Sequence, residues 1–428
     1  MKKYVTDIKN HIYLKESDIN MKKTTSSQDN IINIDCKKIV SKYLGMGGAI
    51  TESVAYNYFL LTDKNKKRFI NDCYSEKGLN YRLGRISIGS CDFSLGYYSY
   101  AKKKDLSDFS IDRDKRYVIP LLKDILKTKK IILVSSPWSP PKMYKKIKLL
   151  NYGIKLAKRY YDSYSNYLIK YLEYYRKEGI NIEYLTMQNE PLARQKWESC
   201  KFDLEEQKDF IYQYLLPKLA NCKLLLYDHN KDDLFNKIEC LYQENSKVAG
   251  VAFHNYSGQY FNELRKINEK YHNLLLINTE GCCGYSEYNE LSWISDAEYY
   301  LNDIIGDFNN GCNAYLDWNI LLDERGGSCH VKNPVKSMLI LKNGDYIKTP
   351  IYYYIYHISH FINYNMDIIF NNMIHDKIKV IVFKNNKKII IVVMNKNNLK
   401  YSFQININNN YINDSINSHS IITYEINL

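Results

Sequence analysis

The sequence predicts an α/β fold: a (β/α)8 TIM barrel accompanied by an antiparallel β domain built from both ends of the chain. Three observations support this prediction. A short β-branched run, a polar or Gly-rich turn and a longer stretch with helical periodicity follow one another eight times. Polar residues follow nearly every predicted strand, as at the active face of such barrels. After residue 350 the pattern changes to alternating strands separated by Asn-rich turns.

The predicted barrel strands are short and apolar, and each precedes a polar or Gly-rich segment. They are YLGMGGAI (43–50), YRLGRISIG (81–89), KIILVSS (130–136), IEYLTMQ (182–188), KLLLYD (223–228), VAGVAFHN (248–255), LLLINT (274–279) and NAYLDW (313–318). Between the third and fourth strands, residues 151–178 place tyrosines and leucines at helical spacing, and Gly179 ends that helix.

We divide the chain into three parts: N-terminal strands over 1–40, the barrel over 41–350 and a β-sandwich-like domain over 351–428. The N-terminal part contains IYLKE and NIINID, which resemble the later strands and are expected to complete the same sheet. The C-terminal strands read IKVIVF (378–383), KIIIVVM (388–394) and SIITYEI (420–426).

Composition narrows the class of protein. The net charge of +13 comes from scattered lysines, and runs such as 64–68 lack the alternating aromatic residues of a nucleic-acid surface, so no nucleic-acid partner is expected. No apolar run is long enough for a membrane span. The first 18 residues contain no signal-like apolar segment, so a cytoplasmic location with reduced cysteines is expected, while export by another route stays open. The residues leave the oligomeric state undetermined.

Two local patterns could indicate a different kind of site, but neither contains all the residues that such a site needs. Cys91, Cys282 and Cys283 have no His, Asp or Glu beside them at metal-ligand spacing, so neither a metal nor a thiol nucleophile is expected. The glycines at 45–48 lack the lysine of a phosphate loop, and we interpret them as a tight turn beneath a ligand site. No cofactor is expected.

Two glutamates stand at the ends of predicted strands four and seven. Glu190 lies in TMQNEP before a turning proline, and Glu280 lies in INTEG before a glycine. In an eight-stranded barrel these strands face each other across the mouth. Retaining hydrolysis of a glycosidic bond needs two carboxyl groups about 5–5.5 Å apart, one as acid and one as nucleophile. From spacing alone, a catalytic pair and two ordinary polar strand ends both remain open.

Seven motifs decide between these interpretations. GMGGAITES, YRLGRISIGSCDFS, SSPWSPP, TMQNEP, FHNY, NTEGC and YLDWN occur in an order and at intervals that resemble glycoside hydrolase family 30, the glucosylceramidase family. The resemblance runs from about residue 30 to the C-terminus. It implies a retaining β-glycosidase in which Glu190 is the acid/base and Glu280 the nucleophile.

The resemblance also assigns supporting roles. Asn189 matches the residue that bonds the sugar 2-hydroxyl, and Tyr256 matches the donor that steadies the nucleophile. His254 lies beside Tyr256, and Arg85 matches the arginine whose charge keeps Glu280 ionised. We expect Glu190 to have the higher pKa of the two glutamates. The residues that would hold the sugar are Asp92, Trp138, Trp318 and Asn333, with Trp197 as a candidate for the outer wall.

The chain departs from the family pattern on the aglycone side. Pro140-Pro141 is followed by Lys142-Met143-Tyr144 where a tryptophan is usual, and the loop 150–154 and the segment after Glu280 are short. The expected substrate is a β-glucoside such as the glycolipid glucosylceramide, with peripheral lipid contact left open. The alternatives are a β-1,6-glucanase or β-xylosidase of the same chemistry, and a non-catalytic carbohydrate-binding barrel.

Overall fold

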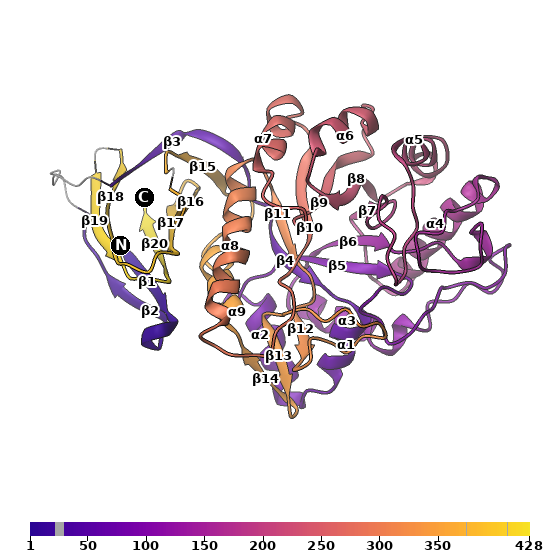
Figure 1. Ribbon diagram of the computed structural model, residues 1–428, viewed down its shortest axis with the longest axis horizontal. Coiled ribbons are helices and arrows are strands. Elements are labelled where there is room, and N and C mark those ends of the chain that lie inside the picture. Colours follow the sequence, from indigo (N-terminus) through magenta and orange to yellow (C-terminus); the bar gives the residue numbers. More distant parts are fainter. Residues whose placement is uncertain (22–29, 374, 409) are drawn as a thin grey trace.

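The computed structural model describes residues 1–21, 30–373, 375–408 and 410–428, and its centre is a closed barrel of eight parallel strands (Figure 1). All eight predicted strands are present, so the predicted fold class is confirmed. Six of them are shorter than predicted, whereas those at 223–230 and 275–281 are longer. The barrel strands are β4 (Gly45–Ala49), β5 (Leu83–Ile88), β6 (Ile132–Pro137), β7 (Tyr184–Thr186), β8 (Lys223–Asn230), β9 (Val248–His254), β10 (Leu275–Gly281) and β11 (Ala314–Asp317).

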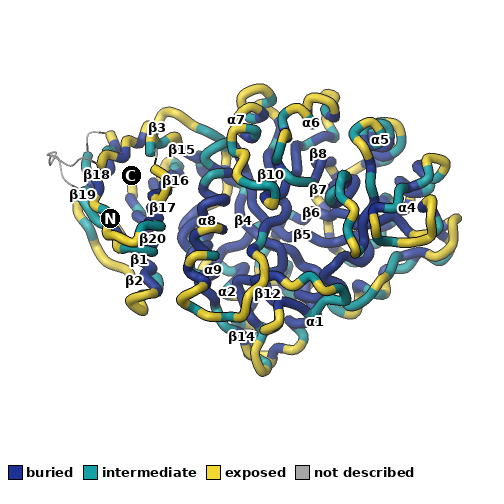
Figure 2. Tube along the Cα trace, in the orientation of Figure 1, coloured by how far each residue is buried: buried dark blue, intermediate teal, exposed yellow. Residues whose placement is uncertain are grey.

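Helices lie around the barrel and bury their apolar faces against it, while their outer faces are exposed (Figure 2). The predicted tyrosine-rich helix begins at Tyr161 rather than near residue 151, because Gly153 has a φ of +61° and Tyr152 N donates to Gln195 O at 2.7 Å. The helices are α1 (Glu52–Phe59), α2 (Asp63–Tyr74), α3 (Val118–Thr128), α4 (Tyr161–Lys177), α5 (Leu204–Asp209), α6 (Leu234–Leu241), α7 (Phe261–Lys270), α8 (Trp293–Asn309) and α9 (Pro350–Ser359).

Both chain ends enter one nine-stranded sheet, in the order β19-β18-β3-β15-β16-β17-β20-β1-β2. N-terminal β1 pairs with C-terminal β20, as predicted, whereas β18 and β3 pair in parallel, so the sheet is mixed rather than purely antiparallel. Its strands are β1 (Lys2–Asp7), β2 (Ile12–Asp18), β3 (Ile31–Lys42), β15 (Asp367–Asn371), β16 (Ile378–Lys384), β17 (Lys388–Asn395), β18 (Tyr401–Ile407), β19 (Asn410–Ile416) and β20 (Ser420–Asn427). A small third sheet of β12 (Leu321–Asp323), β13 (Leu339–Lys342) and β14 (Asp345–Lys348), which was not predicted, follows β11.

Helices α8 and α9 lie between the barrel and the nine-stranded sheet (Figure 1). His357 on α9 is fully buried, and its two ring nitrogens lie 2.7 Å from Thr423 Oγ1 on β20 and 2.8 Å from Thr6 Oγ1 on β1. Burial lowers the pKa of His357 to about 3, so the ring is neutral and shares its hydrogen bonds with the two hydroxyls. The domain boundaries at residues 40 and 350 stay a prediction.

The glycines of β4 mark close packing and not the tight turn that we expected. A Cβ on Gly47 would lie 2.0 Å from Leu83 O, and one on Gly48 would lie 2.1 Å from Ile320 Cγ2. Neighbouring strands therefore approach each other at a distance that only glycine permits. None of the helices in the described part of the chain is long and apolar enough to cross a membrane.

Removing residues 378–428 should leave insoluble or unfolded protein. The truncation deletes β16 to β20 and uncovers the apolar surface that α8 and α9 bury against the sheet. Circular dichroism and the soluble fraction on expression, compared with those of the full chain, test this prediction. A soluble, cooperatively folded barrel without these residues would show that the two parts are separable.

Candidate active site

A pocket of about 370 Å³ opens at the carboxyl ends of the barrel strands. Its lining includes nine of the eleven side chains that the sequence singled out. The other two, Arg85 and His254, lie below the pocket with exposures of 1% and 0%. The predicted residues therefore come together in one place, although they originate from six different strand ends and loops.

Strand β10 aims Glu280 into the pocket through a β-bulge. The register with β9 shifts between Asn278 and Glu280, and the register with β11 shifts between Asn278 and Gly281. Such a bulge turns a side chain that would otherwise follow the strand's alternation. Gly281 is required here, because a Cβ would lie 2.1 Å from the Tyr315 hydroxyl.

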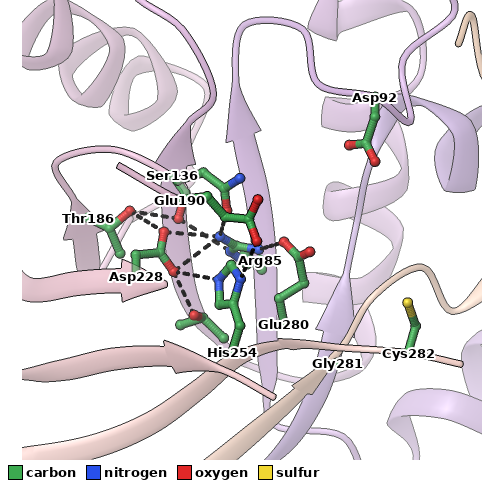
Figure 3. A network of polar contacts seen from close by, with 12 residues as sticks. Arg85, Asp92, Ser136, Thr186, Glu190, Asp228, His254, Glu280, Gly281 and Cys282 are labelled. Carbon is green, nitrogen blue, oxygen red and sulfur yellow. Dashed lines mark hydrogen bonds and ion pairs between the residues drawn. The ribbon is translucent and has the colours of Figure 1, made fainter. Parts of the chain in front are cut away.

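Two donors hold the Glu280 carboxyl group. Arg85 Nη1 lies 2.5 Å from Glu280 Oε2 (Figure 3). Tyr256 OH donates to Oε1 at 3.0 Å. Tyr256 lines the pocket and is 43% exposed. Both oxygens of Glu280 are therefore held in fixed directions by donors from other strands.

Arg85 also organises the floor of the pocket. Its Nη2 donates to Asn189 Oδ1 at 2.8 Å and to Asp228 Oδ2 at 3.0 Å, so one guanidinium orients two strand ends besides Glu280. Asp228 in turn accepts hydrogen bonds of 2.7 and 2.6 Å from Thr186 and Thr279 (Figure 3). Burial alone raises the pKa of Asp228, but the charge of Arg85 and the bond from His254 hold it well below its usual value.

Glu190 sits in a strained turn at the end of β7. Its φ is +45°, in the left-handed region, and its backbone N donates to Asp228 O at 2.9 Å. Gln195 Nε2 donates to Glu190 Oε2 at 3.1 Å, while the Nδ1 atoms of His254 and His229 lie 3.5 and 3.8 Å from Oε1. The second carboxyl group of the pocket is therefore placed by the backbone and by polar side chains, without direct contact with Arg85.

Two histidines lower the pKa of Glu190, a shift that the sequence did not predict. Burial alone raises the pKa of Glu190, but the contacts with His229 and His254 outweigh burial and lower the pKa below its usual value. Both ring nitrogens of His254 face carboxylates, since Nε2 lies 3.1 Å from Asp228 Oδ1. Burial lowers the pKa of His254, yet the charge of Glu280 and the contacts with Asp228 and Glu190 raise it to about 9. We therefore treat Glu190 and His254 as a coupled pair that shares one proton.

The opposite wall combines a carboxyl group with two indoles. Asn333 Nδ2 donates to Asp92 Oδ2 at 2.8 Å, and burial together with the charge of Glu280 raises the pKa of Asp92. Trp138 and Trp318 stack with ring centroids 5.3 Å apart and an interplanar angle of 17°. Because both indoles are nearly buried, they serve as core and as pocket wall together. Trp197 lines the same pocket from the loop after β7.

Several residues of the site were not predicted. Asp228 and His229 lie near the end of strand β8. Polar residues at a strand end are common in ordinary turns, so the sequence alone did not mark these two as site residues. Gln195 and Asn230 gave no signal at all. Cys282 lines the pocket with its Sγ 3.4 Å from Tyr256 OH, and the described residues include no cluster of three or more His, Cys, Asp or Glu suited to a metal ion.

A (β/α)8 barrel with two carboxyl groups and stacked indoles around one pocket has the architecture of a glycoside hydrolase. The chain matches the glycosyl hydrolase family 30 TIM-barrel domain over residues 43–362, and it belongs to that family of retaining glycosidases.

Three similar proteins extend the comparison. The lysosomal acid glucosylceramidase of Mus musculus is 29% identical over 362 residues, which cover 78% of this chain and 70% of the mouse protein. The crystal structure of SrfJ from Salmonella typhimurium superposes with a TM-score of 0.96 at 27% identity and covers 100% of this chain and 99% of SrfJ. The endo-β-1,6-glucanase BT3312 superposes with a TM-score of 0.86 at 25% identity and covers 99% of this chain and 98% of its own.

Replacing Arg85 by methionine should cost about 3–5 kcal/mol of folding free energy, because Asp228 would become a buried charge without its cation. Adding Asp228→Asn to Arg85→Met should recover part of the loss. Arg159→Met, at an exposed arginine, is the matched control. Urea unfolding curves measure all three variants. Equal stability of Arg85→Met and Arg159→Met would contradict this account of the floor.

Proposed function

We propose that this chain hydrolyses a β-D-glucoside by double displacement with retention of configuration. Glu280 is the nucleophile and Glu190 the general acid/base. The observation that carries the proposal is the asymmetry of the two carboxyl groups that share the pocket. Only Glu280 is bound by Arg85 and Tyr256, which stabilise a carboxylate, whereas Glu190 faces His254, which can exchange a proton with it.

In the first step, a Glu280 oxygen attacks the anomeric carbon while the bond to the aglycone breaks and Glu190 gives a proton to the departing oxygen. The proton comes from the pair of Glu190 and His254, so it must reside on Glu190 when the leaving group departs. In the second step, Glu190 takes a proton from water, which attacks the anomeric carbon and releases Glu280. Two inversions return the β configuration.

The pocket suits a pyranose next to the scissile bond. Asp92 and Asn333 supply polar groups for equatorial hydroxyls, and the stacked indoles supply an apolar wall. Asn189, held by Arg85, is placed to bond the 2-hydroxyl, an interaction that strengthens as the oxocarbenium-like transition state forms. These contacts support recognition of the sugar. Recognition of the aglycone has to be argued from another part of the chain.

A loop beside the pocket supports a glycolipid as the aglycone-bearing substrate. Ile147, Leu149 and Tyr152 follow β6 with exposures of 57%, 47% and 55%, although they are apolar or aromatic. Lys146 and Lys148 alternate with them and are also exposed, and residues 142–152 contain no acidic side chain. Exposed apolar groups among lysines favour contact with an anionic lipid surface. Such contact would present a membrane-embedded glucosylceramide to the pocket.

Endo-β-1,6-glucan hydrolysis is the second candidate, and the similarity to BT3312 over nearly the whole chain favours it. A β-xylosidase would use the same catalytic groups on a sugar without a hydroxymethyl group. A non-catalytic carbohydrate-binding barrel is the alternative of another class. The paired carboxyl groups argue against it, since a binding site needs no acid opposite a positioned nucleophile.

Glu190→Ala should lose most activity on poor alkoxide leaving groups and much less on activated aryl β-glucosides, because activated groups depart without protonation. Added azide should accelerate turnover of the activated substrate and give the β-glycosyl azide. Steady-state rates and NMR of the product test this prediction. Glu280→Gln is the matched control, which should lose activity on both substrates without azide rescue. An α-azide would exclude retention.

A substrate panel tests the aglycone. We expect turnover of an aryl β-glucoside and of glucosylceramide in vesicles, with activity enhanced by phosphatidylserine relative to pure phosphatidylcholine. The double variant Ile147→Ser/Leu149→Ser should lose about tenfold activity on the vesicles, because it removes exposed apolar area that the lipid would bury. It should lose none on the soluble glucoside. Leu399→Ser, at an exposed leucine in the C-terminal part, is the control. Activity on β-1,6-glucan alone, or only on a β-xyloside, would reject the glycolipid assignment.

A further inference from the structure

A half-buried histidine and a buried glutamate meet outside the pocket lining. Glu198, in the loop after β7, is 1% exposed, and its Oε1 lies 3.4 Å from Nε2 of His330, which follows β12. Neither residue belongs to the pocket lining. Neither oxygen of Glu198 has a hydrogen-bond partner among the described residues. A carboxyl group buried in this way requires a counter-charge, and His330 is the side chain that forms an ion pair with it.

The geometry defines the protonation of His330. Its Nδ1 lies 2.9 Å from Ser94 O, a carbonyl oxygen that can only accept, so Nδ1 carries a proton. Its Nε2 lies 3.4 Å from Glu198 Oε1, too far for a hydrogen bond in this geometry but within ion-pair distance once that nitrogen carries a proton. The ring that suits both contacts is therefore the imidazolium. Burial lowers the pKa of His330, but Glu198, the Ser94 carbonyl and Asp92 together raise it by more, so the net shift favours the same charged form.

The three residues of this contact belong to three loops of the sugar site. Ser94 follows Asp92 by two residues, Glu198 directly follows Trp197, and His330 precedes Asn333 by three. Asn333 and Asp92 are themselves hydrogen-bonded, so the imidazolium and the amide join the same two loops at two points. Backbone N of His330 also donates to Ser94 O at 3.0 Å. Loss of the Nε2 proton would remove the attraction to Glu198 and so release the loop of Trp197, while the bonds to Ser94 remain.

We infer that His330 is a protonation-dependent positioning residue, which as an imidazolium holds the loops of Asp92, Trp197 and Asn333 together for sugar binding. This inference rests on the proposed function of the pocket. Because a histidine with a raised pKa is charged at low pH and loses its proton as pH rises through that pKa, sugar binding should weaken toward alkaline pH.

Other titratable groups surround the contact, and each bears on its pH dependence. Asp92 and Cys91 approach from the loop after β5, Tyr97 packs edge-on at 4.5 Å between ring centroids, and Cys329 adjoins His330 in sequence. Lys145 faces Glu198 from the loop after β6, where burial lowers its pKa to about 8. Only a variant at His330 separates the effect of the imidazole from that of Lys145.

The experiment measures KM and kcat for an aryl β-glucoside as a function of pH in the full chain, in His330→Gln and in Glu198→Gln. In the unmodified chain KM should rise as His330 loses its proton. His330→Gln should have a KM about tenfold higher at acidic pH, with this rise removed and kcat little changed. Glu198→Gln should shift the rise of KM to lower pH, because His330 loses its counter-charge. His272→Gln, at an exposed histidine, is the control.

Two further measurements do not depend on turnover. Calorimetry with a non-hydrolysable aryl β-thioglucoside gives the same pH dependence as a dissociation constant. NMR titration of labelled histidines, with His330 assigned through the His330→Gln variant, should show a pKa above about 6.5 that falls in Glu198→Gln. An unchanged KM profile in His330→Gln, a loss confined to kcat, or an ordinary pKa for His330 would each overturn the inference. Absence of turnover together with the expected NMR titration would reject the proposed function and leave the histidine contact established.

Discussion

The guanidinium of Arg85 is the interaction on which the site depends. It is a buried cation inside the barrel, and it bonds carboxylates from β8 and β10 and the amide that follows β7. In a low-dielectric interior each of these charges would be costly alone. Together they are neutralised and fixed in direction, because the planar guanidinium offers several donors in one rigid group. The three strand ends are therefore positioned relative to one another before any substrate arrives.

Backbone irregularities at the strand ends also position the residues of the pocket. The bulge in β10 turns Glu280 toward the pocket, and a second register shift in β8 falls between Tyr227 and His229, next to Asp228. Glu190 and Asp228 both have positive φ, although neither is a glycine. Regular strands would send alternate side chains into the barrel or toward the helices. The irregular strand ends allow neighbouring residues to face one pocket, at a cost that the surrounding hydrogen bonds offset.

The sequence predicts the barrel well because each strand ends in a recognisable turn and because the order of motifs is specific. The candidate pair Glu190 and Glu280 and the residues proposed to bind the sugar follow from that order. The polar network does not, because Asp228 and His229 look like any polar strand end until the neighbouring strands are placed. The lowered pKa of Glu190 could not be predicted for the same reason: it depends on histidines from β8 and β9, 39 and 64 residues away. The parallel pairing of β18 with β3 also depends on contacts between distant segments.

His254 and His330 have similar electrostatic surroundings, although His254 is more deeply buried than His330. Both nitrogens of His254 face carboxylates, and both nitrogens of His330 face acceptors, one of them a carboxylate. A neutral imidazole has one donor and one acceptor and cannot satisfy either environment, so each position selects the charged ring. His254 lies beside Glu190, and in the proposed mechanism its proton passes to that carboxyl group. His330 lies beneath the sugar-binding loops, where its charge can only hold residues in place. In our proposals the same chemistry supports proton transfer at one site and loop positioning at the other, and the difference is set by whether the facing carboxyl group lines the pocket, as Glu190 does and Glu198 does not.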